Sequence, residues 1–254
     1  MTEMMDYNDV IGDLVEFGAP SEPRGLKTTE MVDFRISTLA GNYPYRTRMN
    51  RKLAYLEGLM LVGGIFDLDL IRQVAPNANI KLYEKQSDYG IRVRNQVPII
   101  IEELRNDIES RRAVIQFNGT LHLGTDNVAC TLGAQFLVRQ QKFYSHFFMR
   151  SWDAVLGLPN DVVMFGMLSQ AIERCVVKCL HNIITVTAGS FHLYESNRHL
   201  AVATGQRIFR LNDNWPTTWP EIRQKAEWLA RNHETWGTVP TDIIEDEGNL
   251  FEVG

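Results

Sequence analysis

The stretch DNVACTLGAQFLVRQQKFYSHFFMRSWDAVLGLPND, residues 126–161, decides how the rest of this chain is interpreted. Apolar residues alternate with others over 130–138 and again over 143–149, which predicts two β-strands. A short turn between them predicts a hairpin that brings Arg150 back beside Cys130. Positive charge lowers the pKa of a thiol, and the thiolate is the nucleophilic form. The stretch therefore predicts a reactive cysteine, although a lone Cys in a strand is also often a buried apolar residue.

The second half of this stretch adds polar side chains that suit a site: Arg150, Ser151, Asp153 and Asp161. The first two can bind an anion, and the last two supply carboxylates. A turn is predicted at 157–159, and a long apolar helix is predicted over 162–180. Asp161 therefore has an ordinary alternative role, because its side chain is a good cap for that helix.

Length and composition bound the class of protein. With 254 residues and no low-complexity linker, the chain is predicted to be one domain over residues 1–254. A net charge of −5 argues against nucleic acid as a partner. Three cysteines without a paired spacing are typical of a protein in the reducing cytoplasm. We expect no signal peptide and no membrane partner, because no run approaches the ~20 apolar residues of a membrane span.

Further elements follow from hydrophobic periodicity. Helices are predicted over residues 6–17, 50–62, 66–74, 98–108 and 221–231. Strands are predicted over residues 28–36, 113–117 and 182–188. Cys175 and Cys179 lie four positions apart near His181, which is a weak metal signal that packing explains better, so no metal is predicted. We also find no glycine loop of the kind that a flavin enzyme would need.

Several polar residues outside the opening stretch have both an ordinary and a functional explanation. They are Arg24, Glu57, Arg111, Arg112 and His192. A surface position is the default for an arginine, and a lone His is more often structural. Glu57 could lie on the solvated face of its helix, yet its neighbours are apolar, and burial of an unpaired carboxylate is costly.

The segments CTLGAQFLV, MRSWD and LGLPND resemble the active-site block of the thymidylate synthase family. That block has a nucleophilic Cys, then Arg-Ser-x-Asp, then Leu-Gly-x-Pro-x-Asn. Here Asp161 stands in place of the final Asn, which is similar to the deoxycytidylate hydroxymethylase branch. The family's tryptophan-bearing insert is reduced to about residues 80–88, and no Trp occurs between Glu57 and Cys130. Trp152 places a large ring inside the Arg-Ser-x-Asp segment.

The resemblance implies a role for each matching residue. Those implied to be catalytic are Cys130, Glu57, Tyr89 and Asp161. Those implied to bind the nucleotide are Arg24, Arg150, Ser151, Asp161, His192 and Tyr194, with Arg111 and Arg112 reaching across a homodimer interface from the second subunit. Those implied to contact the folate are Asp153 and Gly157.

The resemblance also implies a fold and a reaction. The expected fold is α+β, with a mixed or antiparallel sheet flanked by helices and paired sheet to sheet in a homodimer. The expected reaction transfers a one-carbon unit from 5,10-methylenetetrahydrofolate to C5 of CMP or dCMP, giving the 5-hydroxymethyl nucleotide. The alternative is C5 methylation of dCMP or dUMP with hydride from tetrahydrofolate. An inactive nucleotide-binding homologue is disfavoured, because Cys130 and Glu57 are both present.

Overall fold

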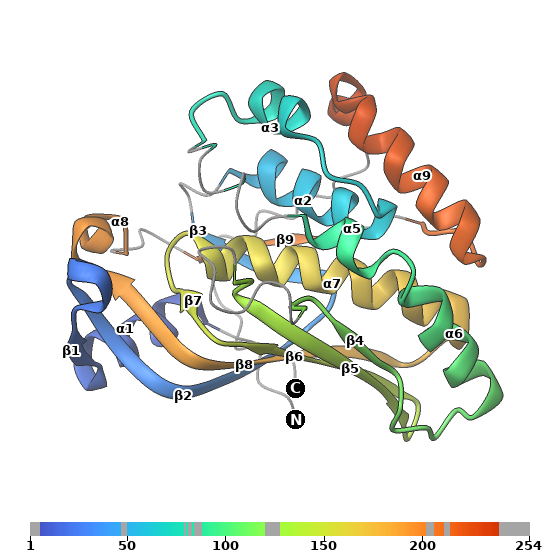
Figure 1. Ribbon diagram of the computed structural model, residues 1–254, viewed down its shortest axis with the longest axis horizontal. Helices are drawn as coiled ribbons and strands as arrows, with labels where there is room; N and C mark the ends of the chain where they lie inside the picture. Colours follow the sequence, from blue (N-terminus) through green and yellow to red (C-terminus); the bar gives the residue numbers. More distant parts are fainter. Residues whose placement is uncertain are drawn as a thin grey trace.

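The computed structural model describes residues 6–46, 50–78, 80, 83, 88–119, 128–201, 206–210 and 214–238, with the backbone alone for 42–46, 206–210 and 237–238. A seven-stranded sheet lies at the base of this part of the chain, and most helices lie on one side of it (Figure 1). Its strands are β1 (Ala19–Ser21), β2 (Thr28–Leu39), β4 (Val114–Gln116), β5 (Thr131–Arg139), β6 (Lys142–Met149), β7 (Trp152–Asp153) and β8 (His181–Tyr194).

The sheet is mixed. Its order is β1-β2-β8-β6-β5-β4, and β7 also pairs with β8. The strands β6 and β7 run parallel to β8, whereas the other pairs are antiparallel. A second, two-stranded sheet joins β3 (Asn42–Arg46) and β9 (Gln206–Arg210). The predicted α+β class with a mixed sheet is confirmed.

Six of the described helices lie close to predicted ranges, and the two short helices over residues 89–93 and 198–201 were not predicted. The described helices are α1 (Tyr7–Phe17), α2 (Arg51–Gly63), α3 (Leu68–Val74), α5 (Tyr89–Val93), α6 (Val97–Asn106), α7 (Gly157–Val176), α8 (Arg198–Ala201) and α9 (Trp219–Arg231). Short 3-10 turns lie at η1 (Pro23–Gly25), η3 (Glu195–Asn197) and η4 (His233–Thr238). None of the described helices combines the length and apolarity that crossing a bilayer requires.

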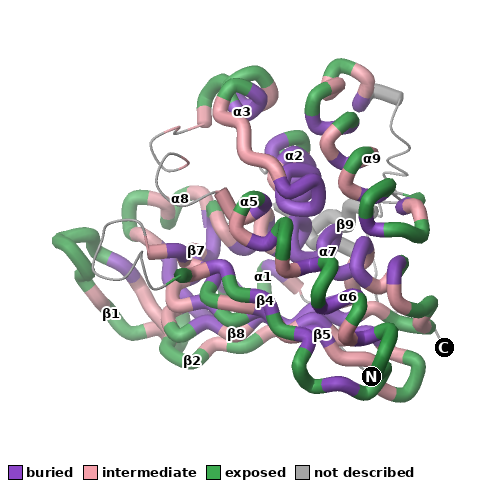
Figure 2. Tube along the Cα trace, turned by 45° about the vertical axis from the view of Figure 1, so that its right-hand side comes forward, coloured by how far each residue is buried: buried purple, intermediate pink, exposed green. Residues whose placement is uncertain are grey.

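The core lies between the sheet and the central helices α2 and α7. Figure 2 shows that α2 is almost wholly buried, whereas α3 and α9 keep exposed outer faces. Phe165 of α7 stacks on Phe147 of β6 with ring centroids 4.0 Å apart. The two helices approach closely at Gly58, where a Cβ atom would lie 2.2 Å from the Sδ of Met167. A side chain at this position would require the Met167 side chain to move, and both helices carry residues of the site described below.

The start of α7 corrects one prediction. The segment 157–159 is the first turn of the helix, and not a turn that precedes it. The Oδ1 of Asp153 accepts hydrogen bonds from the backbone N–H groups of Val155 and Leu156, both at 2.7 Å, and this bond pair turns the chain into the helix. Proline is tolerated here because the first turn lacks intrahelical partners for its N–H groups. Asp161 is consequently inside the helix and does not cap it.

The predicted hairpin is confirmed. Strands β5 and β6 pair antiparallel, with Thr131 opposite Met149 and an irregularity in register next to Gly133. The backbone N–H of Arg150 donates to the carbonyl of Cys130 at 2.8 Å. This bond closes the open end of the hairpin and places the two side chains side by side.

Candidate active site

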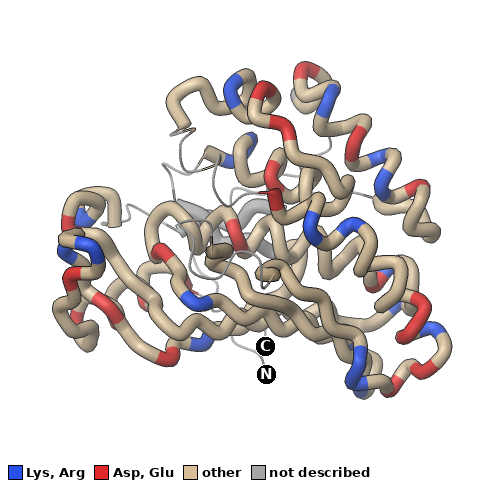
Figure 3. The backbone as a smooth tube through the Cα atoms, in the orientation of Figure 1, with Lys and Arg blue, Asp and Glu red and all other residues tan. Residues whose placement is uncertain are grey.

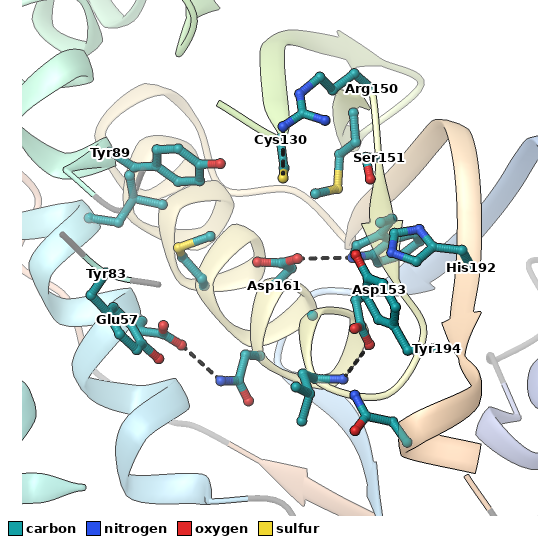
Figure 4. Close-up of a pocket in the computed structure, with 18 of the residues that line it drawn as sticks. Glu57, Tyr83, Tyr89, Cys130, Arg150, Ser151, Asp153, Asp161, His192 and Tyr194 are labelled. Atoms are coloured by element: carbon teal, nitrogen blue, oxygen red, sulfur yellow. Dashed lines mark hydrogen bonds between the residues drawn. The ribbon is translucent and has the colours of Figure 1, made fainter. Parts of the chain in front are cut away.

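One cavity of about 940 Å³ gathers most of the predicted site residues. Those that line it are Arg24, Glu57, Tyr89, Cys130, Arg150, Ser151, Asp153, Gly157, Asp161, His192 and Tyr194. They come from the start of β5, the end of β6, β7, α2, α5, α7, β8 and the η1 turn. Figure 4 shows Cys130, Arg150 and Ser151 on one side of the cavity, with Asp161 facing them and Glu57 further along the wall.

Arg150 is fixed against Cys130. Its Nε donates to the carbonyl of Ala129 at 3.1 Å, and its Nη2 donates to the carbonyl of Val128 at 2.9 Å. The same Nη2 lies 3.7 Å from the Sγ of Cys130. Because backbone carbonyls hold the guanidinium, its position beside the thiol is set by the hairpin itself.

The ionisation of Cys130 depends on more than the nearby positive charge on which the sequence prediction was based. Burial raises the pKa of the thiol above its usual value of 9.0, and Arg150 lowers the pKa by a smaller amount. The nearby carboxylates of Asp161 and Asp153 act in the same direction as burial. The predicted effect of Arg150 on the thiol is thus present, but burial outweighs it and the net shift of the Cys130 pKa is upward.

Tyr89 supports the backbone at Cys130. Its hydroxyl oxygen accepts a hydrogen bond from the backbone N–H of Thr131 at 3.1 Å. Its ring packs edge-on against Phe117, with centroids 5.1 Å apart. Burial raises the pKa of the phenol, and the charge of Cys130 adds to this effect. Tyr89 therefore stays neutral near pH 7.

Glu57 lies in a network that the sequence alone does not reveal. The Nδ2 of Asn160 donates to its Oε2 at 2.9 Å, and Tyr83 also hydrogen-bonds the carboxyl group. Desolvation by burial raises the pKa of Glu57 from 4.5 to about 7, although both hydrogen bonds oppose this shift. A carboxyl group with a pKa near 7 can donate or accept a proton at neutral pH. Asn160 is brought to Glu57 because α7 begins at Gly157.

The raised pKa of Glu57 predicts a pH-dependent stability. Between pH 4.5 and about pH 7, the Glu57 carboxyl group keeps its proton in the folded protein and releases it in the unfolded chain. The resulting stabilisation is complete below the unfolded-state value and is lost as the pH rises through about 7. When the pH is raised from about 5 to about 8, the native chain should lose this stabilisation and Glu57→Gln should not. We therefore expect the unfolding free energy of Glu57→Gln, relative to that of the native chain, to rise by about 2 to 3 kcal/mol over this change of pH. Urea unfolding at both pH values measures this difference.

The exposed Glu102 on α6 provides the matched control, and Glu102→Gln should show no such difference between the two pH values. An equal effect of Glu57→Gln at both pH values would contradict the shift.

Asp161 is paired with Trp152. The Nε1 of Trp152 donates to the Oδ2 of Asp161 at 2.9 Å. Desolvation raises the pKa of Asp161 well above 3.8, and the charges of Glu57 and Asp153 act in the same direction, whereas the bond from Trp152 lowers the pKa. The carboxyl group consequently holds a proton over a wider pH range than an exposed aspartate.

His192 and Tyr194 form the far end of the cavity (Figure 4). Their rings meet edge to face with centroids 4.9 Å apart. The Nδ1 of His192 is buried and has no hydrogen-bond partner among the described residues. Burial lowers the pKa of this imidazole, so the neutral form prevails near pH 7. A buried polar atom without a partner is costly, and a ligand hydroxyl in the cavity would satisfy it.

Two predicted residues lie outside the cavity of this chain. Arg111 and Arg112 are exposed in the segment just before β4, and an Nη of Arg112 is 2.8 Å from an Oε of Glu103. Figure 3 shows acidic and basic residues interspersed along α9 and over the rest of the described chain. Within the described residues, no group of three or more His, Cys, Asp or Glu side chains is placed to hold a metal ion. Cys175 is packed in the core.

Some cavity residues were not predicted as site residues. They are Tyr83, Trp152 and Asn160, with Met149, Met164, Ser196 and Asn197. The contact of Asn160 with Glu57 depends on the helix beginning at Gly157, so the segment LGLPND alone gave no signal for it. The C-terminal residues 247–254 lie outside the described residues.

Fold and site together define a candidate cysteine-dependent active site in an α+β protein, with two carboxyl groups of raised pKa opposite the thiol. The chain belongs to the thymidylate synthase family, because the family model described as "Thymidylate synthase" matches residues 75–232, more than half of the chain.

Curated relatives carry the same description. The chain is similar to the thymidylate synthase of Buchnera aphidicola subsp. Baizongia pistaciae, with 32% identity over 122 residues, which cover 47% of this chain and 44% of the relative. It is also similar to the thymidylate synthase of Ascaris suum, with 28% identity over 112 residues, 42% of this chain and 37% of the relative. The matches therefore span less than half the length of these relatives.

Proposed function

We propose that this chain transfers a one-carbon unit from 5,10-methylenetetrahydrofolate to C5 of a pyrimidine nucleoside monophosphate. The observation that carries the proposal is the position of the Cys130 thiol, 3.7 Å from Arg150 in a cavity that also holds Glu57 and Asp161. C5 of a pyrimidine is a weak nucleophile until a thiolate adds to C6 and moves electron density onto C5. Cys130 is the nucleophile in this proposal.

The nucleotide phosphate would be bound by arginines. Arg24, Arg150 and Ser151 line one region of the cavity, and a guanidinium has five N–H donors, so Arg150 keeps donors for a phosphate beyond those bound to carbonyls. Arg111 and Arg112 would come from a second copy.

Dimerisation through the open face of the sheet is part of this proposal. That face of β6 carries Tyr144, His146 and Phe148, and Phe148 is 43% exposed. A second copy packed sheet to sheet would cover these side chains.

The folate would lie on the side of Asp153 and Gly157. Both residues line the cavity, and Asp153 uses Oδ1 for the two backbone N–H groups at the start of α7. Its second oxygen is then available to accept hydrogen bonds from a pterin ring. Gly157 has no side chain to fill the space beside Asp153 and Trp152, where a Cβ would lie 3.5 Å from each.

Asp161 supports a cytosine base. Cytosine presents an N4 amino donor and an unprotonated N3, and a carboxyl group can accept from N4 while sharing a proton with N3. The raised pKa of Asp161 supports this assignment, because a carboxyl group that holds a proton more readily is better able to share one with N3. An ionised aspartate would instead repel O4 of uracil, because both oxygens are hydrogen-bond acceptors.

Two fates of the transferred carbon have support. The names of the relatives favour reduction to a methyl group, as in a thymidylate synthase. Glu57 favours hydration to a hydroxymethyl group as a second candidate, because its pKa of about 7 suits the activation of a water molecule. The shortened insert, without tryptophan, also supports less complete exclusion of water from the methylene.

One assay tests the reaction and separates the products. We expect tritium release from [5-³H]dCMP or [5-³H]CMP that requires methylenetetrahydrofolate. Dihydrofolate formed in equal amount identifies methylation, whereas tetrahydrofolate without dihydrofolate identifies hydroxymethylation. The same assay compares ribose with deoxyribose. Absence of tritium release from both cytidine and uridine nucleotides would reject the proposed function.

A further inference from the structure

The indole of Trp152 is held rigidly behind Asp161. Trp152 is 1% exposed and lies opposite Phe191 in the parallel pairing of β7 with β8. Its ring centroid lies 5.5 Å from that of Phe191 and 6.4 Å from that of Phe34. The sheet therefore fixes the direction of the indole N–H, which points at the Oδ2 of Asp161.

An indole N–H can only donate a hydrogen bond. Oδ2 must therefore act as an acceptor, and a hydroxyl oxygen at Oδ2 would accept the indole N–H less strongly than a carboxylate or carbonyl oxygen does. Rotating the carboxyl group brings its other oxygen into the same position and under the same restriction. Whichever oxygen lies at the indole is thus the one on which a proton is disfavoured.

The indole-bound oxygen is also the one suited to face N3 of a cytosine. In Figure 4 this oxygen lies on the His192 side of Asp161, and the other oxygen lies on the side of Tyr89 and Glu57. A water molecule activated by Glu57 has to reach the methylene on C5, so C5 is placed toward Glu57, and the N4 amino group is attached to the carbon next to C5. N4 then meets the oxygen on the Glu57 side, and N3 meets Oδ2.

We propose that Trp152 is a positioning residue that keeps the shared proton on N3 of the base instead of on Asp161. This inference rests on the proposed function, in which Asp161 reads a cytosine. One proton moves from the carboxyl group to N3, the carboxylate keeps the electron pair, and both of its oxygens then accept from the base. A protonated N3 withdraws electron density from C6, so the Cys130 thiolate adds more readily. The proton returns to Asp161 when the thiolate leaves.

The bond from Trp152 has the energetic direction that this role requires. It lowers the pKa of Asp161, against the desolvation and the charges of Glu57 and Asp153, which raise it. Removing the indole N–H leaves those opposing effects in place. The proton should then return to the carboxyl group, where it still bonds N3 but no longer activates C6.

The decisive measurement is the ¹⁵N signal of [3-¹⁵N]dCMP bound to Cys130→Ala, a variant that prevents addition to C6. We expect the signal of a protonated N3 in this variant and the signal of a neutral N3 after the further change Trp152→Phe. In the protein with Cys130 intact, Trp152→Phe should lower kcat by about tenfold and leave the Kd for dCMP within about twofold. A purely structural role of Trp152 would weaken binding and turnover together.

The exposed Trp228 of α9 supplies the control, and Trp228→Phe should change neither the ¹⁵N signal nor kcat. A neutral N3 in the complex that retains Trp152 overturns the inference without any tryptophan variant. It leaves the proposed function standing if dCMP is still converted. Failure of dCMP to bind or react overturns both.

Discussion

Replacing Cys130 by alanine is expected to lower kcat for one-carbon transfer by about 10⁴-fold or more, because Cys130 is the only cysteine among the described residues that line the cavity and thus the group able to form the bond to C6. The nucleotide should still bind, since the carbonyls of Val128 and Ala129 hold Arg150 in place in addition to its contact with the thiol. Tritium release from C5 measures the loss of turnover, and titration calorimetry with dCMP measures the retained binding.

Cys179 is the matched control for this prediction. It is only partly buried and does not line the cavity, so Cys179→Ala should keep turnover near that of the native chain. If Cys130→Ala retained more than about a hundredth of the native kcat, covalent catalysis by this residue would be excluded.

Asp161→Asn is expected to reverse the choice of base, changing the ratio of kcat/KM for dCMP over dUMP by about 10²-fold or more. The amide oxygen of the variant should accept the bond from Trp152, since an indole N–H can only donate. That oxygen then faces N3–H of uracil, and the amide NH₂ faces O4. Cytosine would meet two mismatched groups, and buried polar groups without partners are costly.

Competition between the two nucleotides in one reaction measures this ratio directly. Asp153→Asn is the control, because it changes a carboxylate in the same cavity that bonds the start of α7. Its effect should fall on the use of folate and leave the base ratio unchanged. An unaltered ratio in Asp161→Asn would show that Asp161 does not read the base.

Local sequence patterns were sufficient for most of the fold. The alternation over 130–149 predicted the hairpin of β5 and β6, and this hairpin brings Arg150 to Cys130. Hydrophobic periodicity placed the central helix α2 within one or two residues of its observed ends. These features depend on residues that are close in the sequence, so they can be predicted without a structure.

The start of α7 could not be predicted from the sequence in the same way. Gly157 and Pro159 are typical of a turn, and the side-chain bonds of Asp153 convert this segment into the first turn of a helix. The contacts of Trp152 with Asp161 and of Asn160 with Glu57 depend on that change, the second joining residues 103 positions apart. The roles of Arg111 and Arg112 involve a second chain and stay predictions.

The long pairing of β2 with β8 limits how this protein can be shortened. Eleven residue pairs align the two strands, yet β2 precedes the segment 75–232 that carries the family match. A recombinant fragment cut to that segment would leave one side of β8 with unsatisfied backbone groups, which invites self-association. It would also lack Glu57. Expression of the matched segment alone should therefore give insoluble protein, although this segment contains Cys130, Arg150 and Asp161.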